Sequence, residues 1–113
     1  QAAHGQYFIA EAPVVVVVCV HPARSARHYG NRGASLYCLQ DTGAFIQNML
    51  LASYAIGLGS CWVGAFDEAR AAEAIEAPDT IRPVAIVPIG SPAESPSAPS
   101  RRSLEDIVHE ERF

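Results

Sequence analysis

The glycine-rich segment, Gly57–Phe66 (GLGSCWVGAF), combines three glycines with a cysteine and the only tryptophan of the chain. Glycine has no Cβ and readily adopts positive φ, so Gly57, Gly59 and Gly64 allow a sharp helix exit and a close approach of main-chain N–H groups to a flat ligand. These ten residues are compatible with a backbone segment that lies against a flat cofactor. They are equally compatible with a helix C-cap followed by a core strand. The segment is therefore a candidate binding site.

Known phosphate-binding motifs do not match these glycines. A G-x-G-x-x-G fingerprint follows a strand and opens a helix, whereas an apolar helical pattern precedes Gly57. A P-loop requires Gly-Lys-Ser/Thr, and no such tripeptide follows. The spacing thus argues against both classes of nucleotide site.

Nucleophilic and metal chemistry have little support. Ser60 lacks the G-x-S-x-G elbow, and the apolar neighbours of Cys61 favour a packed, inert thiol, which is a candidate nucleophile only if exposed. The histidines show no metal-ligand spacing: His4, His21, His28 and His109. We predict neither a side-chain nucleophile nor a metal site.

Four further side chains have one structural and one binding interpretation. Asp41 either caps a helix or accepts a hydrogen bond from a ligand. Trp62 either stacks on a planar ring or fills the core. Arg101 and Arg102 either donate to a phosphate or form a solvated pair. The residue types alone leave these alternatives open.

The apolar pattern predicts the elements before and within the candidate site. Val14–Val20 is an unbroken β-branched run, typical of a central strand buried on both faces, and residues 23–34 are expected to form a surface loop. Residues 36–56 fit a helix that is apolar almost all round. Because so short a chain cannot enclose such a helix, we expect a dimer.

The second half of the chain alternates short elements with polar connections. Ser60–Ala65 is expected to be extended, and Asp67 to cap a helix over residues 68–76. Arg82–Gly90 is predicted as a strand with its two prolines at an end, an edge or a bulge. A Pro- and Ser-rich connector, 91–100, leads to a brief helix that begins after Ser103.

Composition limits the partners. The chain has 113 residues, 50% of them hydrophobic, which predicts one ordered domain. A net charge of −4 argues against nucleic acid, and no apolar run reaches the roughly 20 residues that span a bilayer. The three cysteines, odd in number and unpaired in spacing, suggest reduced core thiols and a cytoplasmic protein with small-molecule partners.

Four blocks, in their order and spacing, resemble the C-terminal two thirds of nitroreductase-family flavoproteins: residues 10–20, 36–66, 81–94 and 101–113. The resemblance implies an α+β fold with a mixed, mainly antiparallel sheet flanked by helices, in an interleaved homodimer. Residues 1–113 would be one partial domain of this kind. The family's N-terminal Arg-Arg-Ser phosphate motif and its Asn/Gln-Pro-Trp block are expected to precede Gln1, and Pro99 stands where many members have a second basic residue.

The resemblance also implies an FMN site. Trp62, Val63, Gly64 and Ala65 match the backbone beside the flavin ring, with the N–H of Gly64 or Ala65 directed to flavin N5. Asp41 matches a ring-proximal position, and Arg101 and Arg102 match the basic residues that bind the FMN phosphate. No catalytic side chain is implied.

The implied activity is that of an FMN-dependent NAD(P)H oxidoreductase, in which hydride passes from nicotinamide to flavin N5 and on to a nitroaromatic, quinone or similar acceptor. Two alternatives stay open. One is a dehalogenase or flavin-destroying relative of the same fold, although residues 24–34 lack obvious lid chemistry. The other is a non-catalytic fragment that binds flavin or mediates dimerisation.

Overall fold

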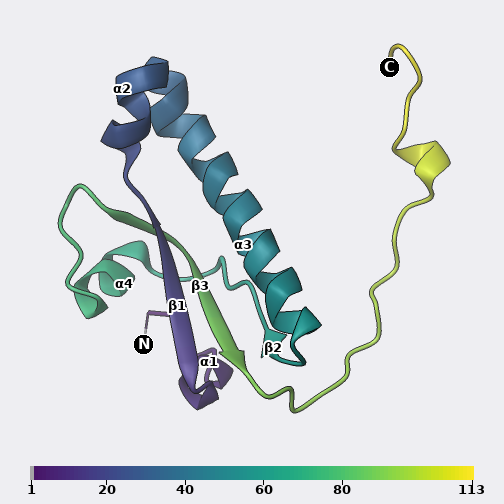
Figure 1. Ribbon diagram of the computed structural model, residues 1–113, viewed down its shortest axis with the longest axis horizontal. Helices are drawn as coiled ribbons and strands as arrows, with labels where there is room; N and C mark the ends of the chain where they lie inside the picture. Colours follow the sequence, from purple (N-terminus) through teal and green to yellow (C-terminus); the bar gives the residue numbers. More distant parts are fainter. Residues whose placement is uncertain (1) are drawn as a thin grey trace.

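A three-stranded sheet with one long helix lying across it forms the body of the molecule (Figure 1). The computed structural model describes residues 2–113. Its elements are α1 (Phe8–Glu11), β1 (Val14–Val20), α2 (Pro22–Arg32), the π-helical turn η1 (Gly33–Tyr37), α3 (Cys38–Ala55), β2 (Gly59–Ser60), α4 (Glu68–Ala74), β3 (Arg82–Gly90) and the 3-10 turn η2 (Leu104–Asp106).

The sheet has the order β1-β3-β2, and both pairings are antiparallel. β3 is therefore the central strand, and the expectation that Val14–Val20 is central was wrong: within residues 2–113 β1 has a neighbour on one side only. Val14 and Val15 are accordingly exposed, at 53% and 41%. A β-branched run indicates a strand, but its number of neighbours depends on residues far away in sequence.

The core lies between the sheet and α3. Ile46 of α3 and Val87 of β3 are fully buried and pack with Val18 and Ala85. Much of the rest of α3 is uncovered, with large apolar side chains exposed by 56–82% at three helix positions and at the residue that follows the helix: Phe45, Leu51, Tyr54 and Ile56. As expected from the sequence, this chain alone does not enclose the helix.

Residues 23–34 are helical, so the predicted surface loop was wrong. Pro22 occupies the first turn of α2, where its missing N–H costs no hydrogen bond, and His21 Nδ1 accepts from the N–H of Arg24 at 3.3 Å. Gly30 interrupts the helix with φ 56° and ψ −144°. The helix contains few apolar side chains, so the apolar pattern gave no signal for it, whereas His21 and Pro22 mark its start.

The remaining predictions agree with the structure in outline. Asp67 caps α4 by accepting from the N–H of Arg70 at 3.0 Å, and the helix ends two residues earlier than expected. Arg82 donates to both oxygens of Glu68, at 2.8 Å each, which ties α4 to β3 and lowers the pKa of the Glu68 carboxyl. Pro83 lies beside the bulge at Val18/Cys19.

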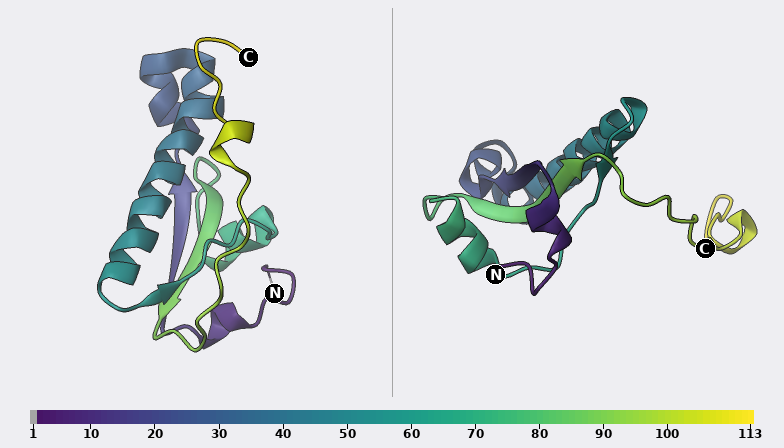
Figure 2. Two further views of the ribbon diagram at one scale, coloured as in Figure 1. Left: turned by 90° about the vertical axis from the view of Figure 1, so that its right-hand side faces the viewer. Right: turned by 90° about the horizontal axis from the view of Figure 1, so that it is seen from below.

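The C-terminal arm, residues 91–113, is exposed throughout and leaves the body of the molecule (Figures 1 and 2). Ser103 caps its single 3-10 turn by accepting from the N–H of Asp106 at 3.2 Å. Across residues 2–113, no helix is both long enough and apolar enough to cross a membrane.

Gly57 ends α3, which confirms the helix-exit interpretation of the first glycine. The N–H of Leu58 donates to the carbonyl of Ser53 at 2.9 Å, and the N–H of Gly57 donates to that of Tyr54 at 3.0 Å. These two bonds form a Schellman motif, which requires the positive φ of 80° found at Gly57.

Substitution Gly57→Ala should therefore lower the free energy of unfolding by about 1–2 kcal/mol, because a Cβ is strained at this φ. Gly43→Ala is the control: a Cβ there meets only Trp62, at 3.7 Å, and helix propensity favours alanine. Urea denaturation at one protein concentration measures both variants. Equal midpoints for Gly57→Ala and the parent would contradict the assignment.

Candidate functional site

Val63 fastens the glycine-rich segment to the central strand. Its N–H donates to the carbonyl of Ile86 at 2.9 Å, and its carbonyl accepts from the N–H of Ile86 at 3.0 Å. Two residues earlier, the N–H of Cys61 donates to the carbonyl of Pro88 at 3.3 Å, but Pro88 has no N–H to donate in return. The segment is thus anchored to the sheet without continuing as a regular strand.

The next two residues present unused backbone donors. Gly64 and Ala65 are exposed, and within residues 2–113 no acceptor lies in hydrogen-bonding reach of either N–H. The carbonyl of Ala65 accepts from Gln6 Nε2 at 2.9 Å, and the N–H of Asp67 donates to the carbonyl of Ala2 at 2.8 Å. The backbone is therefore held on both sides of two donors that can meet an acceptor atom of a ligand.

The indole ring of Trp62 lies between Gly64 of the glycine-rich segment and Gly43 of α3. A Cβ on Gly43 would stand 3.7 Å from the outer ring of the indole, and a Cβ on Gly64 would stand 3.9 Å from its Nε1. The side chain is 44% exposed, so it does not fill the core. Its position beside the free donors leaves an aromatic surface available to a planar ligand.

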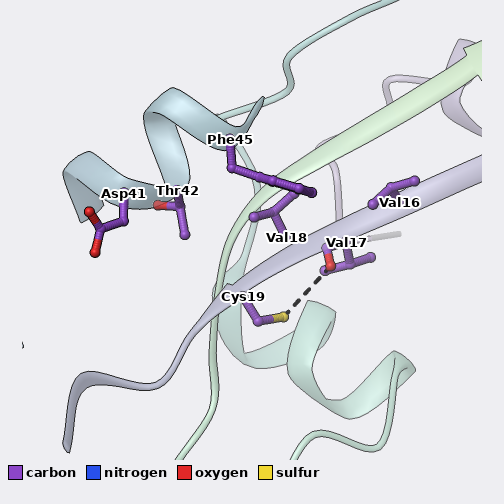
Figure 3. Close-up of a pocket in the computed structure, with 7 residues that line it drawn as sticks. All are labelled: Val16, Val17, Val18, Cys19, Asp41, Thr42 and Phe45. Carbon is purple, nitrogen blue, oxygen red and sulfur yellow. Dashed lines mark hydrogen bonds between the residues drawn. The ribbon is translucent and has the colours of Figure 1, made fainter. Parts of the chain in front are cut away.

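Asp41 belongs to the first turn of α3 but does not cap it. The helical path runs from η1 directly into α3, with Tyr37 at the N-cap position, so the capping alternative was wrong. Asp41 is exposed and lines an open groove of about 480 Å³ together with Thr42, Phe45 and residues 16–19 of β1. Figure 3 shows the ring of Phe45 reaching over β1 toward Val18, while the carboxylate of Asp41 points away from the strand.

Arg101 and Arg102 do not approach the glycine-rich segment of their own chain. Both are exposed on the C-terminal arm, which stands clear of the sheet and of α3 in Figure 1 and in the right view of Figure 2. Arg102 Nη2 donates to the carbonyl of Asp106 at 2.7 Å, which folds the guanidinium back on its own turn. Within one chain, the Trp62 indole reaches α3 at Gly43, but the groove that Asp41 lines includes none of residues 62–65, and the arginines lie apart from both.

The cysteines differ in their surroundings. Cys38 is buried as expected, whereas Cys61 is exposed, so the prediction of a packed Cys61 was wrong: the adjacent Trp62 is itself 44% exposed, although Val63 is buried. Cys19 is partly buried, and burial raises the pKa of its thiol. None of the three forms a disulfide, and the described part of the chain holds no group of three metal-ligating side chains.

Sequence reasoning missed three residues that shape this site. Gln6 binds the carbonyl of Ala65 from 59 residues away, and no sequence signal marks such a contact. Gly43 is the point on α3 that the Trp62 indole approaches, and an isolated glycine inside a helical pattern is only a weak signal of such a contact. Pro88 was expected at a strand end, an edge or a bulge, but it lies inside the central strand opposite Val15, and its effect on Cys61 follows only from the strand pairing.

This chain is similar in sequence to known nitroreductases. A model of the nitroreductase family matches residues 1–91. An inferred nitroreductase from Methanocaldococcus jannaschii is 34% identical over 93 residues, which cover 82% of this chain and 46% of that protein. An inferred NADH dehydrogenase/NAD(P)H nitroreductase from Methanothermobacter thermautotrophicus is 29% identical over 111 residues, covering 93% and 53%.

Solved structures show the same fold. Nitroreductase A from Vibrio parahaemolyticus superposes with a TM-score of 0.85 at 24% identity, over 98% of this chain and 51% of that one. The chain spans about half the length of the relatives it matches. The family model nevertheless covers most of its residues, and the α+β nitroreductase fold expected from the sequence is confirmed. The chain belongs to the nitroreductase family.

Proposed function

We propose that this chain forms part of an FMN-dependent NAD(P)H oxidoreductase that reduces a nitroaromatic, a quinone or a similar acceptor. The observation that carries the proposal is the pair of free N–H donors at Gly64 and Ala65, on a backbone that Val63 anchors beside Trp62. Membership of the nitroreductase family supports an oxidoreductase, and the name of one relative includes NAD(P)H.

The residues present fit an oxidised flavin ring. Bound FMN would supply a redox centre that accepts and returns hydride at N5. Residues 62–65 would lie along the ring, and the N–H of Gly64 or Ala65 would donate to N5, which accepts hydrogen bonds in the oxidised state. Because Val63 and Gln6 fix this backbone in advance, the donors need no rearrangement when the ring binds. Asp41 would face the ring from the start of α3.

A homodimer would complete the site. Arg101 and Arg102 would bind the FMN phosphate with their guanidinium groups, yet their arm extends away from the glycine-rich segment of the same chain. The arm exposes Leu104, Ile107 and Val108, by 73%, 51% and 58%, and α3 also exposes apolar side chains. A second copy that packs on α3 and receives the arm would cover both surfaces.

The visible absorption spectrum of the purified full-length protein tests this function. We expect flavin bands that bleach when NADPH or NADH is added without oxygen and return when a quinone or nitroaromatic compound follows. Colourless protein that takes up no added FMN would contradict the proposal, as would bound flavin that neither nicotinamide reduces.

Gly64→Ala tests the role of the exposed backbone. A Cβ at this position meets only Trp62 Nε1, at 3.9 Å, so the variant should fold normally. The added methyl group should nevertheless keep the ring from the N–H donors and raise the Kd for FMN about tenfold, or roughly 1.4 kcal/mol.

Quenching of Trp62 fluorescence gives this Kd, because Trp62 is the only tryptophan. Gly43→Ala is the matched control. Its added Cβ also contacts only the Trp62 indole, but it approaches the indole from α3 and not from the backbone of residues 64–65. Its Kd should stay within about twofold of the parent. Parent-like FMN affinity in Gly64→Ala would show that the ring does not approach this backbone.

A further inference from the structure

The segment from β1 to the start of α3 is basic in an otherwise acidic chain. Residues 12–40 contain no Asp or Glu, whereas the whole chain has a net charge of −4. α2 carries three exposed arginines, Arg24, Arg27 and Arg32, and among residues 2–113 none of them pairs with a carboxylate. This helix therefore carries a local positive potential that favours an anionic ligand.

Arg32 is held in place at the end of this helix. Its Nε donates to the hydroxyl of Tyr37 at 3.1 Å, and its guanidinium carbon lies 5.4 Å from the centre of the Tyr37 ring. Tyr29 packs edge-on against Tyr37, with ring centres 5.4 Å apart, and remains 62% exposed. A fixed guanidinium thus stands beside a second aromatic ring that is open to solvent.

Two glycines give this corner its shape. Gly30 adopts φ 56° and ψ −144°, a conformation that turns the chain between Tyr29 and Arg32 and is almost restricted to glycine. Gly33 packs directly on α2: a Cβ there would stand 2.6 Å from the carbonyl oxygen of Ser25. The π-helical turn η1 then continues into α3. The arrangement of Tyr29, Arg32 and Tyr37 is therefore set by the backbone.

We propose that this corner, Tyr29, Arg32 and Tyr37, binds the 2′-phosphoadenosine end of NADPH, so that the protein prefers NADPH to NADH; the inference rests on the proposed function. A guanidinium matches the geometry of a phosphate, and an exposed tyrosine offers a stacking face to adenine. Because NADH has no 2′-phosphate, only NADPH uses both groups.

The corner lies close to the groove that Asp41 lines. Tyr37 and Asp41 are four residues apart, so the corner lies roughly 6 Å along the helical path from the end of the groove. Figure 1 shows α2 at the end of the molecule where α3 begins. Arg24 and Arg27, on the same helix, add charge that favours the phosphates between the two ends of the ligand.

Calorimetric titration of the flavin-loaded protein with NADP+, NAD+, 2′,5′-ADP and 5′-AMP tests the proposal. The parent should bind NADP+ about tenfold more tightly than NAD+, and 2′,5′-ADP more tightly than 5′-AMP. Arg32→Gln should remove this difference by weakening only the two ligands with a 2′-phosphate. Tyr29→Leu should weaken all four about equally, because all contain adenine.

Two further variants separate binding from folding. Tyr37→Phe keeps the ring under Arg32 but removes the hydroxyl acceptor, so it should cause a smaller loss that is again restricted to 2′-phosphate ligands. Arg70→Gln removes the same charge from an exposed site on α4 and should leave all four affinities unchanged.

Equal affinity of the parent for NADP+ and NAD+ would overturn the proposal, and so would an Arg32→Gln variant that loses both to the same extent. Neither result would contradict the proposed oxidoreductase function, because flavin bands that bleach with both NADH and NADPH would still be seen. Loss of the proposed function itself would instead show as absent or unreactive flavin in the parent protein.

Discussion

The reciprocal hydrogen bonds between Val63 and Ile86 fix the position of the candidate site. β3 is the central strand and contributes Val87 to the core, so a segment bonded to it shares the rigidity of the sheet. Pro88 prevents this pairing from extending as a regular ladder, because it cannot donate to Cys61. Beyond Val63 the pairing with β3 stops, and within residues 2–113 the N–H groups of Gly64 and Ala65 make no hydrogen bond, so they remain free for a ligand.

The long helix and the C-terminal arm both leave apolar side chains uncovered. α3 buries Ile46 against the sheet but exposes Phe45 and Tyr54, by 56% and 82%. The C-terminal arm lies close to Gly59 at Pro92 and then extends away from the body. The relatives are about twice as long as this chain. We infer that a flavin ring would meet the glycine-rich segment of one copy, whereas its phosphate would meet the arm of another.

Periodicity and local caps account for what the sequence predicted correctly. The apolar pattern placed α3 and β3, Asp67 marked the start of α4, and Gly57 marked the end of α3. α2 was missed because residues 22–32 contain few apolar side chains; its features in the structure are the His21 cap and the close packing at Gly33. At the candidate site, the glycines indicated main-chain N–H groups as possible donors, but which of these groups are free depends on long-range contacts with Ile86 and Gln6.

A crystal structure of the full-length protein with bound FMN measures the central contact directly. We predict that the backbone nitrogen of Gly64 or Ala65 lies within about 3.2 Å of flavin N5, with Trp62 beside the ring. A flavin whose N5 faces another element, with the N–H groups of Gly64 and Ala65 both bonded to solvent, would contradict it.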